Sequence, residues 1–126
     1  MPKKVLDTPS APASLAAYSP ATEAGGLVFL SGQVGLVPES GERAPDDVSA
    51  QTHQVMANIG AILSDVGLGY DDIVKATVFL ADIADFATVN DVYRSYFGSP
   101  YPARTAVQAG ALPGGYLVEI EVVAAR

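Results

Sequence analysis

The sequence predicts an α+β fold in which two helices cover one face of a single β-sheet. Three observations predict this class: short apolar runs of strand length, two amphipathic stretches with helical spacing, and turns rich in glycine and proline between them. The order of elements is strand, strand, helix, strand, helix, strand, strand. A chain of 126 residues is typical of one domain, so we assign residues 1–126 to a single domain.

The first quarter of the chain predicts an extended lead-in followed by a strand. Residues 5–20 are rich in proline, alanine and serine, which favours an irregular path with a short strand near residues 15–19. A Gly–Gly pair then predicts a tight turn before the apolar run 27–30. That strand ends at Gly32, between two polar residues. The glycine is compatible with close approach of its backbone to another group, or with a plain turn.

Two helices are predicted, each with a start signal and a stop signal. The first begins near Asp46 or Asp47, just after a proline, and its apolar spacing continues to Gly67. The second begins around Asp82 with a capping-box-like pair and ends before Gly98. Its apolar stripe consists of Phe86, Val89, Tyr93 and Phe97.

Polar residues of the two helices need a separate interpretation. Asn90 shares the buried stripe of the second helix, where its amide either bonds to nearby backbone or belongs to a site. His53 lies off the stripe of the first helix, and we expect a solvated surface histidine. It is the only histidine, so a histidine-based metal site is disfavoured. The chain has no cysteine, which excludes disulfides and thiol catalysis.

The C-terminal part of the chain predicts three strands and carries the charges of greatest interest. Residues 73–80 are rich in β-branched and aromatic side chains. Arg104 begins the next short strand, and residues 112–115 have the turn chemistry of a β-hairpin. In the last strand Glu119 and Glu121 share the face opposite the apolar residues. Spacing alone is compatible with a paired site and with a solvated sheet face.

Several predicted strands carry apolar residues on both faces. In the strand 73–80, Val78 and Leu80 point one way, whereas Thr77 and Phe79 point the other way. Two helices can cover one face only, so the second face needs a cover that this chain does not contain. We therefore expect an oligomer whose sheets face each other, with pockets between subunits.

Net charge and hydropathy limit the classes of partner. The formal net charge is −7 without a basic cluster, so we expect no binding to nucleic acid. No apolar run reaches membrane-spanning length, and we expect neither a signal peptide nor a membrane partner. A cytoplasmic protein is the expectation.

Seven segments match one known family in order along nearly the whole chain: Tyr18-Ser19, Phe29 to Gln33, Gln51-Thr52, Lys75 to Leu80, Val89 to Tyr93, Pro102 to Arg104 and Val118 to Glu121. Together they resemble the RidA family, also called the YjgF family of reactive-intermediate imine deaminases. The resemblance implies a chorismate-mutase-like α+β fold with one mixed sheet. It also implies homotrimers, in which three sheets form a central barrel and the active sites lie between subunits.

The resemblance also implies a chemistry. The expected reaction is hydrolysis of 2-imino acids or enamines, such as 2-aminoacrylate and 2-iminobutanoate, to 2-keto acids and ammonia, without a metal or another cofactor. Arg104 matches the arginine that grips the substrate carboxylate, and a planar guanidinium suits that role. Glu119 matches the glutamate near the attacking water. The other matched residues of the pocket wall are Tyr18, Ser31, Gly32, Asn90 and Ala106.

The chain departs from the usual family pattern near the expected pocket. Ala16 and Ala17 precede Tyr18 where many members have Gly-Pro, Gly35 stands where a proline is common, and Ala106 stands where some members have cysteine. We expect these differences to affect the substrate preference more than the reaction type.

Three other functions compete with imine hydrolysis. The first is deamination of a different enamine, of the aminomuconate type. The second is a non-enzymatic trimer that binds small acids or acts as a holdase, although the joint presence of Arg104 and Glu119 favours an enzyme. The third is a ribonuclease, an activity linked to the family, which the net charge of −7 and the single histidine disfavour.

Overall fold

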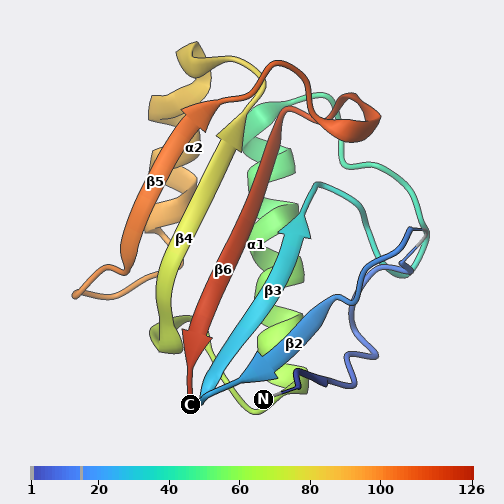
Figure 1. Cartoon of the computed structure of the whole chain (residues 1–126). Helices are drawn as coiled ribbons and strands as arrows, with labels where there is room; N and C mark the ends of the chain where they lie inside the picture. The colour runs from blue at the N-terminus through green and yellow to red at the C-terminus, as the bar shows by residue number, and fades with distance from the viewer. Residues whose placement is uncertain (1, 15) are drawn as a thin grey trace.

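The computed structural model describes residues 2–14 and 16–126, which form one six-stranded sheet and two helices (Figure 1). The strands are β1 (Lys4–Val5), β2 (Ala21–Ala24), β3 (Leu27–Gln33), β4 (Ile73–Leu80), β5 (Ala103–Gln108) and β6 (Val118–Ala125). The helices are α1 (Val48–Asp65) and α2 (Phe86–Arg94). Neither helix is both long and apolar enough to cross a membrane within these described ranges.

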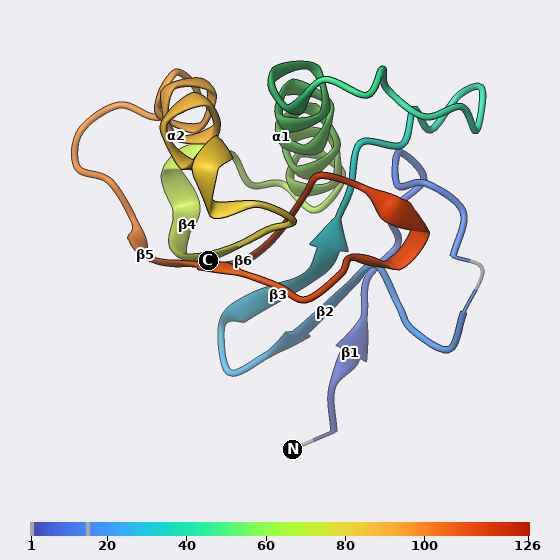
Figure 2. The ribbon, with the colours of Figure 1, turned by 90° about the horizontal axis from the view of Figure 1, so that it is seen from above.

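Both helices lie on the same side of the sheet (Figure 2). The buried side chains of β6 alternate as predicted, since Val118, Ile120 and Val122 are at most 2% exposed and pack with α1 and α2. The intervening residues of β6 point to the opposite face, which no element of the described chain covers in this view. The prediction of one helix-covered sheet face is therefore confirmed.

The strand order is β1-β2-β3-β6-β4-β5, and the sheet is mixed because β4 and β5 pair in parallel while the other pairs are antiparallel. The predicted hairpin between the last two strands is wrong, since β4 lies between β5 and β6. The segment 109–117 passes over the end of β4 instead. There Ala109 N–H donates to the Leu80 carbonyl at 2.8 Å, and Ala81 N–H donates to the Leu117 carbonyl at 3.0 Å.

The strand before the predicted Gly–Gly turn lies later in the chain than expected, whereas the turn itself is confirmed. Of the strand expected near residues 15–19, residue 15 lies outside the described residues and 16–19 form no strand. The strand β2 begins only after Pro20 and pairs with β3 through a two-residue turn at Gly25 and Gly26. Both glycines have positive φ, 59° and 79°, which is the conformation that such a hairpin turn requires.

The helix start signals are confirmed for α1 and shifted for α2. The Asp47 carboxylate accepts a hydrogen bond from Ala50 N–H at 2.9 Å, as an N-cap residue does. Asp82 caps a short 3₁₀ turn, Ile83–Asp85, and α2 proper begins only at Phe86. The expected capping box with Asp85 does not form, because Asp82 bonds to Ala84 N–H instead.

Gln51, a buried residue in the first turns of α1, connects three segments that are distant in sequence. Its Oε1 accepts a hydrogen bond from Leu117 N–H at 2.8 Å, just before β6, and its Nε2 donates to the Pro45 carbonyl at 3.4 Å. Gly35 lies against it, and a Cβ there would stand 3.1 Å from Gln51 Cβ. This close contact leaves little space for a side chain at position 35.

We predict that Gln51→Leu lowers the free energy of unfolding by about 1–3 kcal/mol, because it leaves a partly buried Leu117 N–H without its acceptor. Chemical denaturation followed by circular dichroism measures this loss. Gln108→Leu is the matched control: Gln108 Oε1 also accepts from a backbone N–H, that of Ile83, but at an exposed site where water can replace it. Equal losses for the two variants would contradict the prediction.

Candidate active site

Arg104 lies on the helix side of the sheet and is held by one face of α2. The register pairs Arg104 with Ala76, whose side chain is buried beneath the helices. Arg104 Nη1 donates to Asn90 Oδ1 at 2.7 Å, and the guanidinium lies 4.9 Å from the ring centre of Tyr93 and 5.4 Å from that of Phe86. Asn90 thus bonds to a candidate site residue rather than to nearby backbone.

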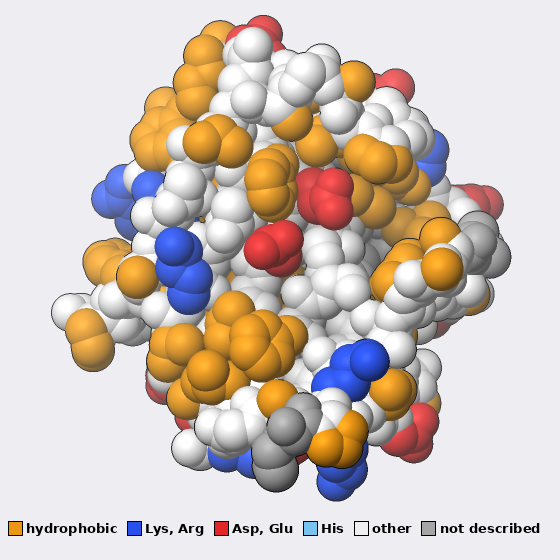
Figure 3. Space-filling model, in the orientation of Figure 1, with side chains coloured by type: hydrophobic (Ala, Val, Ile, Leu, Met, Phe, Trp, Pro, Cys, Tyr) orange, Lys and Arg blue, Asp and Glu red, His pale blue; other side chains and the backbone are white. Residues whose placement is uncertain are grey.

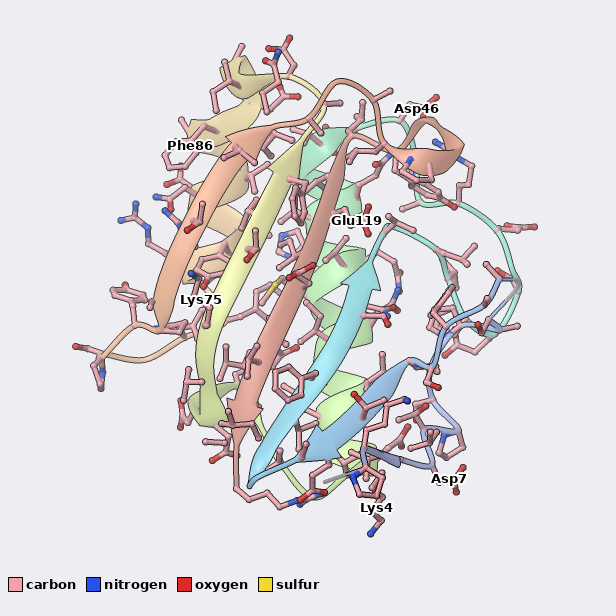
Figure 4. The ribbon with its side chains drawn as sticks, in the orientation of Figure 1. Lys4, Asp7, Asp46, Lys75, Phe86 and Glu119 are labelled. Atoms are coloured by element: carbon pink, nitrogen blue, oxygen red, sulfur yellow. The ribbon has the colours of Figure 1, made fainter. Side chains whose placement is uncertain are left out.

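The three contacts that hold Arg104 come from positions i, i+4 and i+7 of α2, which face the same side of a helix. Figure 4 shows the first of them, Phe86, on α2 beside β5. Stacking on two aromatic faces and the bond to Asn90 fix the guanidinium plane. The remaining N–H groups of Arg104 donate to no other side chain or carbonyl within the described ranges, and can therefore bind an anion.

A hollow of about 430 Å³ opens beside this guanidinium. Its wall is formed by α2 and by the segment that leads into β5. The lining residues are Asn90, Tyr93, Arg94, Tyr101, Pro102 and Arg104. Burial raises the pKa of the Tyr93 phenol, an effect that the nearby Arg104 partly offsets, so the hydroxyl stays protonated at neutral pH.

Glu119 lies on the opposite face of the sheet and is packed against Gly32. A Cβ at Gly32 would collide with the Glu119 carboxylate, so a larger residue there would have to push the Glu119 side chain aside. Gly32 also lies where the pairing of β3 with β6 is irregular, between Leu30 and Gln33. Of the two interpretations of this glycine, close backbone approach is confirmed, and the approaching group is the Glu119 side chain.

Tyr18 and Ser31 lie near the same end of β3 as Gly32. Ser31 Oγ donates to the Ser19 carbonyl at 2.7 Å, and Ser31 N–H donates to the Pro20 carbonyl at 2.9 Å. These bonds fix the segment that carries the half-exposed Tyr18 ring. Tyr18 and Gly32 both line a small hollow of about 50 Å³.

The structure therefore divides the predicted site residues into two groups. The first group, on the β5–α2 side, is Asn90, Arg104 and Ala106; the second group, at the end of β3, is Tyr18, Ser31, Gly32 and Glu119. Ala106 belongs with Arg104 because it follows it by two residues on β5 and is in register with buried Val78. Arg104, Ala76 and Val122 align across the sheet on its helix side. Glu119 alternates with buried neighbours and points away from that side, so the two groups do not meet within one chain.

Two aromatic residues that contact Arg104 were not predicted as site residues. Phe86 and Tyr93 were assigned to the apolar stripe of the second helix, and Tyr93 is indeed buried. Their contact with Arg104 depends on the parallel pairing of β4 with β5, which places Arg104 against α2. The helical spacing of Phe86, Asn90 and Tyr93 was the available signal. A polar side chain between two aromatic ones on one helix face suits contact with a polar group of another element.

The uncovered face carries two carboxylates in apolar surroundings. Figure 3 shows acidic side chains near the middle of this face with hydrophobic ones around them, and Figure 4 places Glu119 there. Partial burial raises the pKa of the Glu119 carboxyl, and the charge of Glu121 raises it further. Within the described chain neither carboxylate forms a salt bridge. Glu119 is thus suited to exchange a proton closer to neutral pH than an ordinary glutamate.

Comparison with known proteins places the chain in a family. The sequence model described as Endoribonuclease L-PSP matches residues 8–126. The chain belongs to this family. Its fold agrees with that of a crystal structure of RidA from an Antarctic Psychrobacter, with a TM-score of 0.92, 42% identity, and coverage of 98% of this chain and 99% of the other. The resemblance to RidA proteins is confirmed.

Two relatives within the L-PSP family carry names that describe an activity. A Bos taurus protein named 2-iminobutanoate/2-iminopropanoate deaminase is 47% identical over 98% of this chain and 90% of its own length. An Arabidopsis thaliana protein named Reactive Intermediate Deaminase A, chloroplastic, is 49% identical over 97% of this chain. The chain spans 65% of the length of the Arabidopsis protein.

We predict that Glu119→Gln raises the thermal stability at neutral pH and has no such effect near pH 3. A raised folded-state pKa means that the folded chain holds the Glu119 proton more tightly than the unfolded chain. Wild type therefore loses stability as pH rises from about 4.3, the ordinary glutamate pKa, to the raised value. Melting temperatures of both proteins between about pH 3 and 8 measure the difference. An equal gain in melting temperature at about pH 3 and pH 8 would show that the raised pKa of Glu119 is not the cause.

Proposed function

We propose that this L-PSP family protein hydrolyses 2-imino acids and their enamine tautomers, including 2-aminoacrylate and 2-iminobutanoate, to 2-keto acids and ammonia. The observation that carries the proposal is the orientation of Arg104, whose guanidinium is fixed by Asn90 and by two aromatic rings while its other donors point to no protein group in the described chain. The names of relatives at 47–49% identity support the same reaction.

The mechanism begins with two parallel hydrogen bonds from Arg104 to the substrate carboxylate, which fix C2 of the imine. A water molecule then adds to C2. Glu119, with its raised pKa, accepts a proton from this water and passes it to the imine nitrogen, which gives a neutral tetrahedral carbinolamine. Glu119 next carries the proton of the C2 hydroxyl to the amino group, the C2–N bond breaks, ammonia leaves, and the carbonyl of the 2-keto acid forms.

A homotrimer with active sites between subunits supplies the geometry that one chain lacks. Arg104 and Glu119 lie on opposite sides of the sheet, so a complete site needs Arg104 from one copy and Glu119 from the next. The uncovered face also presents apolar side chains that favour burial, among them Phe29, which is 40% exposed. We propose that three such faces form a closed barrel. The cytoplasmic location remains a prediction.

The description of the family as an endoribonuclease does not lead us to propose RNA cleavage by this chain. His53, the single histidine, is exposed on α1 and its Nδ1 pairs with the Tyr96 hydroxyl at 2.7 Å. The net charge of −7 opposes binding of a phosphate backbone. Assays on freshly generated imines distinguish the deaminase from a non-enzymatic trimer that binds small acids.

We predict that Arg104→Lys lowers kcat/KM on 2-iminobutanoate by about 10- to 100-fold. Lysine keeps the charge but cannot form two parallel bonds, and a hydrogen bond to a charged group contributes roughly 1.5–3 kcal/mol. The imine is generated in the assay by an amino-acid oxidase, and its loss is followed by trapping with semicarbazide.

Arg126→Lys is the matched control for this experiment, because Arg126 pairs with Glu23 on the surface and outside both site groups. It should stay within twofold of wild type. If Arg104→Lys also stays within twofold, while its fold is intact by circular dichroism, another residue grips the carboxylate.

We predict a trimer mass for the purified protein at micromolar concentration, measured by light scattering coupled to size exclusion. Phe79→Glu should shift the mass towards the monomer, because it adds a charge to the apolar face beside Glu119, its cross-strand partner. Ala57→Glu is the control for one added carboxylate, at an exposed position of α1 on the helix-covered side of the sheet. A wild-type monomer would end the proposal of a shared site.

A further inference from the structure

The hollow beside Arg104 contains a second arginine whose position has no role in the hydrolysis of a monocarboxylic imine. Arg94 lines the same hollow of about 430 Å³ together with Asn90, Tyr101 and Arg104. We propose that Arg94 binds a second carboxylate, and that the preferred substrates are imines of dicarboxylic amino acids, such as 2-iminosuccinate and 2-iminoglutarate. This inference rests on the proposed function and specifies its substrate class.

The distribution of charge supports a dianionic ligand. The chain has 7 basic and 14 acidic residues, yet the lining of this hollow includes two of the basic residues and no acidic one among the described residues. A positive concave region in an acidic chain attracts anions and repels cations locally.

The position of Arg94 on α2 supports the same ligand. Arg94 follows Asn90 by four residues, so both lie on one side of the helix about one turn apart. Arg104 bonds to Asn90, and Arg94 lies one helical turn after Asn90, so both arginines line the same side of the hollow. The volume of the hollow lies within the range of small-molecule sites, roughly 300–1,000 Å³, which leaves room for a longer substrate than a four-carbon imine.

Arg94 is also available for a ligand. Its only salt bridge among the described residues is to Asp91, at 3.6 Å, and the two side chains are 58% and 77% exposed. Such an exposed pair contributes little free energy, because water screens it. A substrate carboxylate that is held at its other end by Arg104 can therefore replace Asp91 as the partner of Arg94.

The test compares kcat/KM for 2-iminoglutarate with kcat/KM for 2-iminobutanoate, each imine being generated by an amino-acid oxidase and trapped with semicarbazide. In wild type we expect the ratio to be one or greater. Arg94→Gln should lower the ratio about tenfold, and Asp91→Asn should raise it by removing the competing carboxylate. Lys4→Gln, which removes one positive charge on β1, should leave the ratio unchanged.

Calorimetric titration with the stable keto acids 2-oxoglutarate and 2-oxobutanoate gives a second measurement that does not depend on turnover. Arg94→Gln should raise the Kd of 2-oxoglutarate about tenfold more than it raises the Kd of 2-oxobutanoate. The dicarboxylate inference is wrong and the proposed function stands if wild type hydrolyses 2-iminobutanoate alone. The same holds if Arg94→Gln changes neither the ratio of the two kcat/KM values nor the ratio of the two Kd values. If wild type hydrolyses neither imine, yet the titration shows the expected loss, the proposed function is wrong and the dicarboxylate site stands.

Discussion

The pairing of β6 between β3 and β4 is the constraint on which the other features of this molecule depend. It buries Val118, Ile120 and Val122 beneath the helices and so fixes which face of the strand carries the carboxylates. On one side it places Glu119 against Gly32 of β3. On the other side it leaves only the far edge of β4 for the next strand, so β5 forms the edge of the sheet and presents Arg104 to α2.

The sequence predicted elements whose signals are local and missed those that depend on pairing. The N-cap at Asp47 and the alternation in β6 depend on residues that are close in sequence, and both are confirmed. The hairpin predicted for residues 112–115 failed because its turn residues are equally suited to a longer connection over the end of β4. The partner of a strand is decided by packing at long sequence separation, which turn chemistry does not report.

The site shows the same division between local and distant information. The closeness of Gly32 to another group was foreseen as one of two alternatives, but the approaching Glu119 could be identified only from the register of β3 and β6. Likewise Asn90 was recognised as a polar residue on an apolar stripe, whereas its bond to Arg104 required the parallel pairing of β4 with β5. The roles of these residues in catalysis stay predictions.

The separation of charge across the sheet has a consequence for how the proposed enzyme controls its proton. In a single chain, partial burial and Glu121 both raise the pKa of Glu119, and no cation opposes them within the described residues. In the proposed trimer, closure of the barrel removes further water from Glu119, while Arg104 of the next copy brings a positive charge that lowers its pKa. A substrate carboxylate bound to that arginine neutralises the cation. Substrate binding therefore raises the pKa of Glu119 again, which makes its carboxylate a stronger base toward the attacking water.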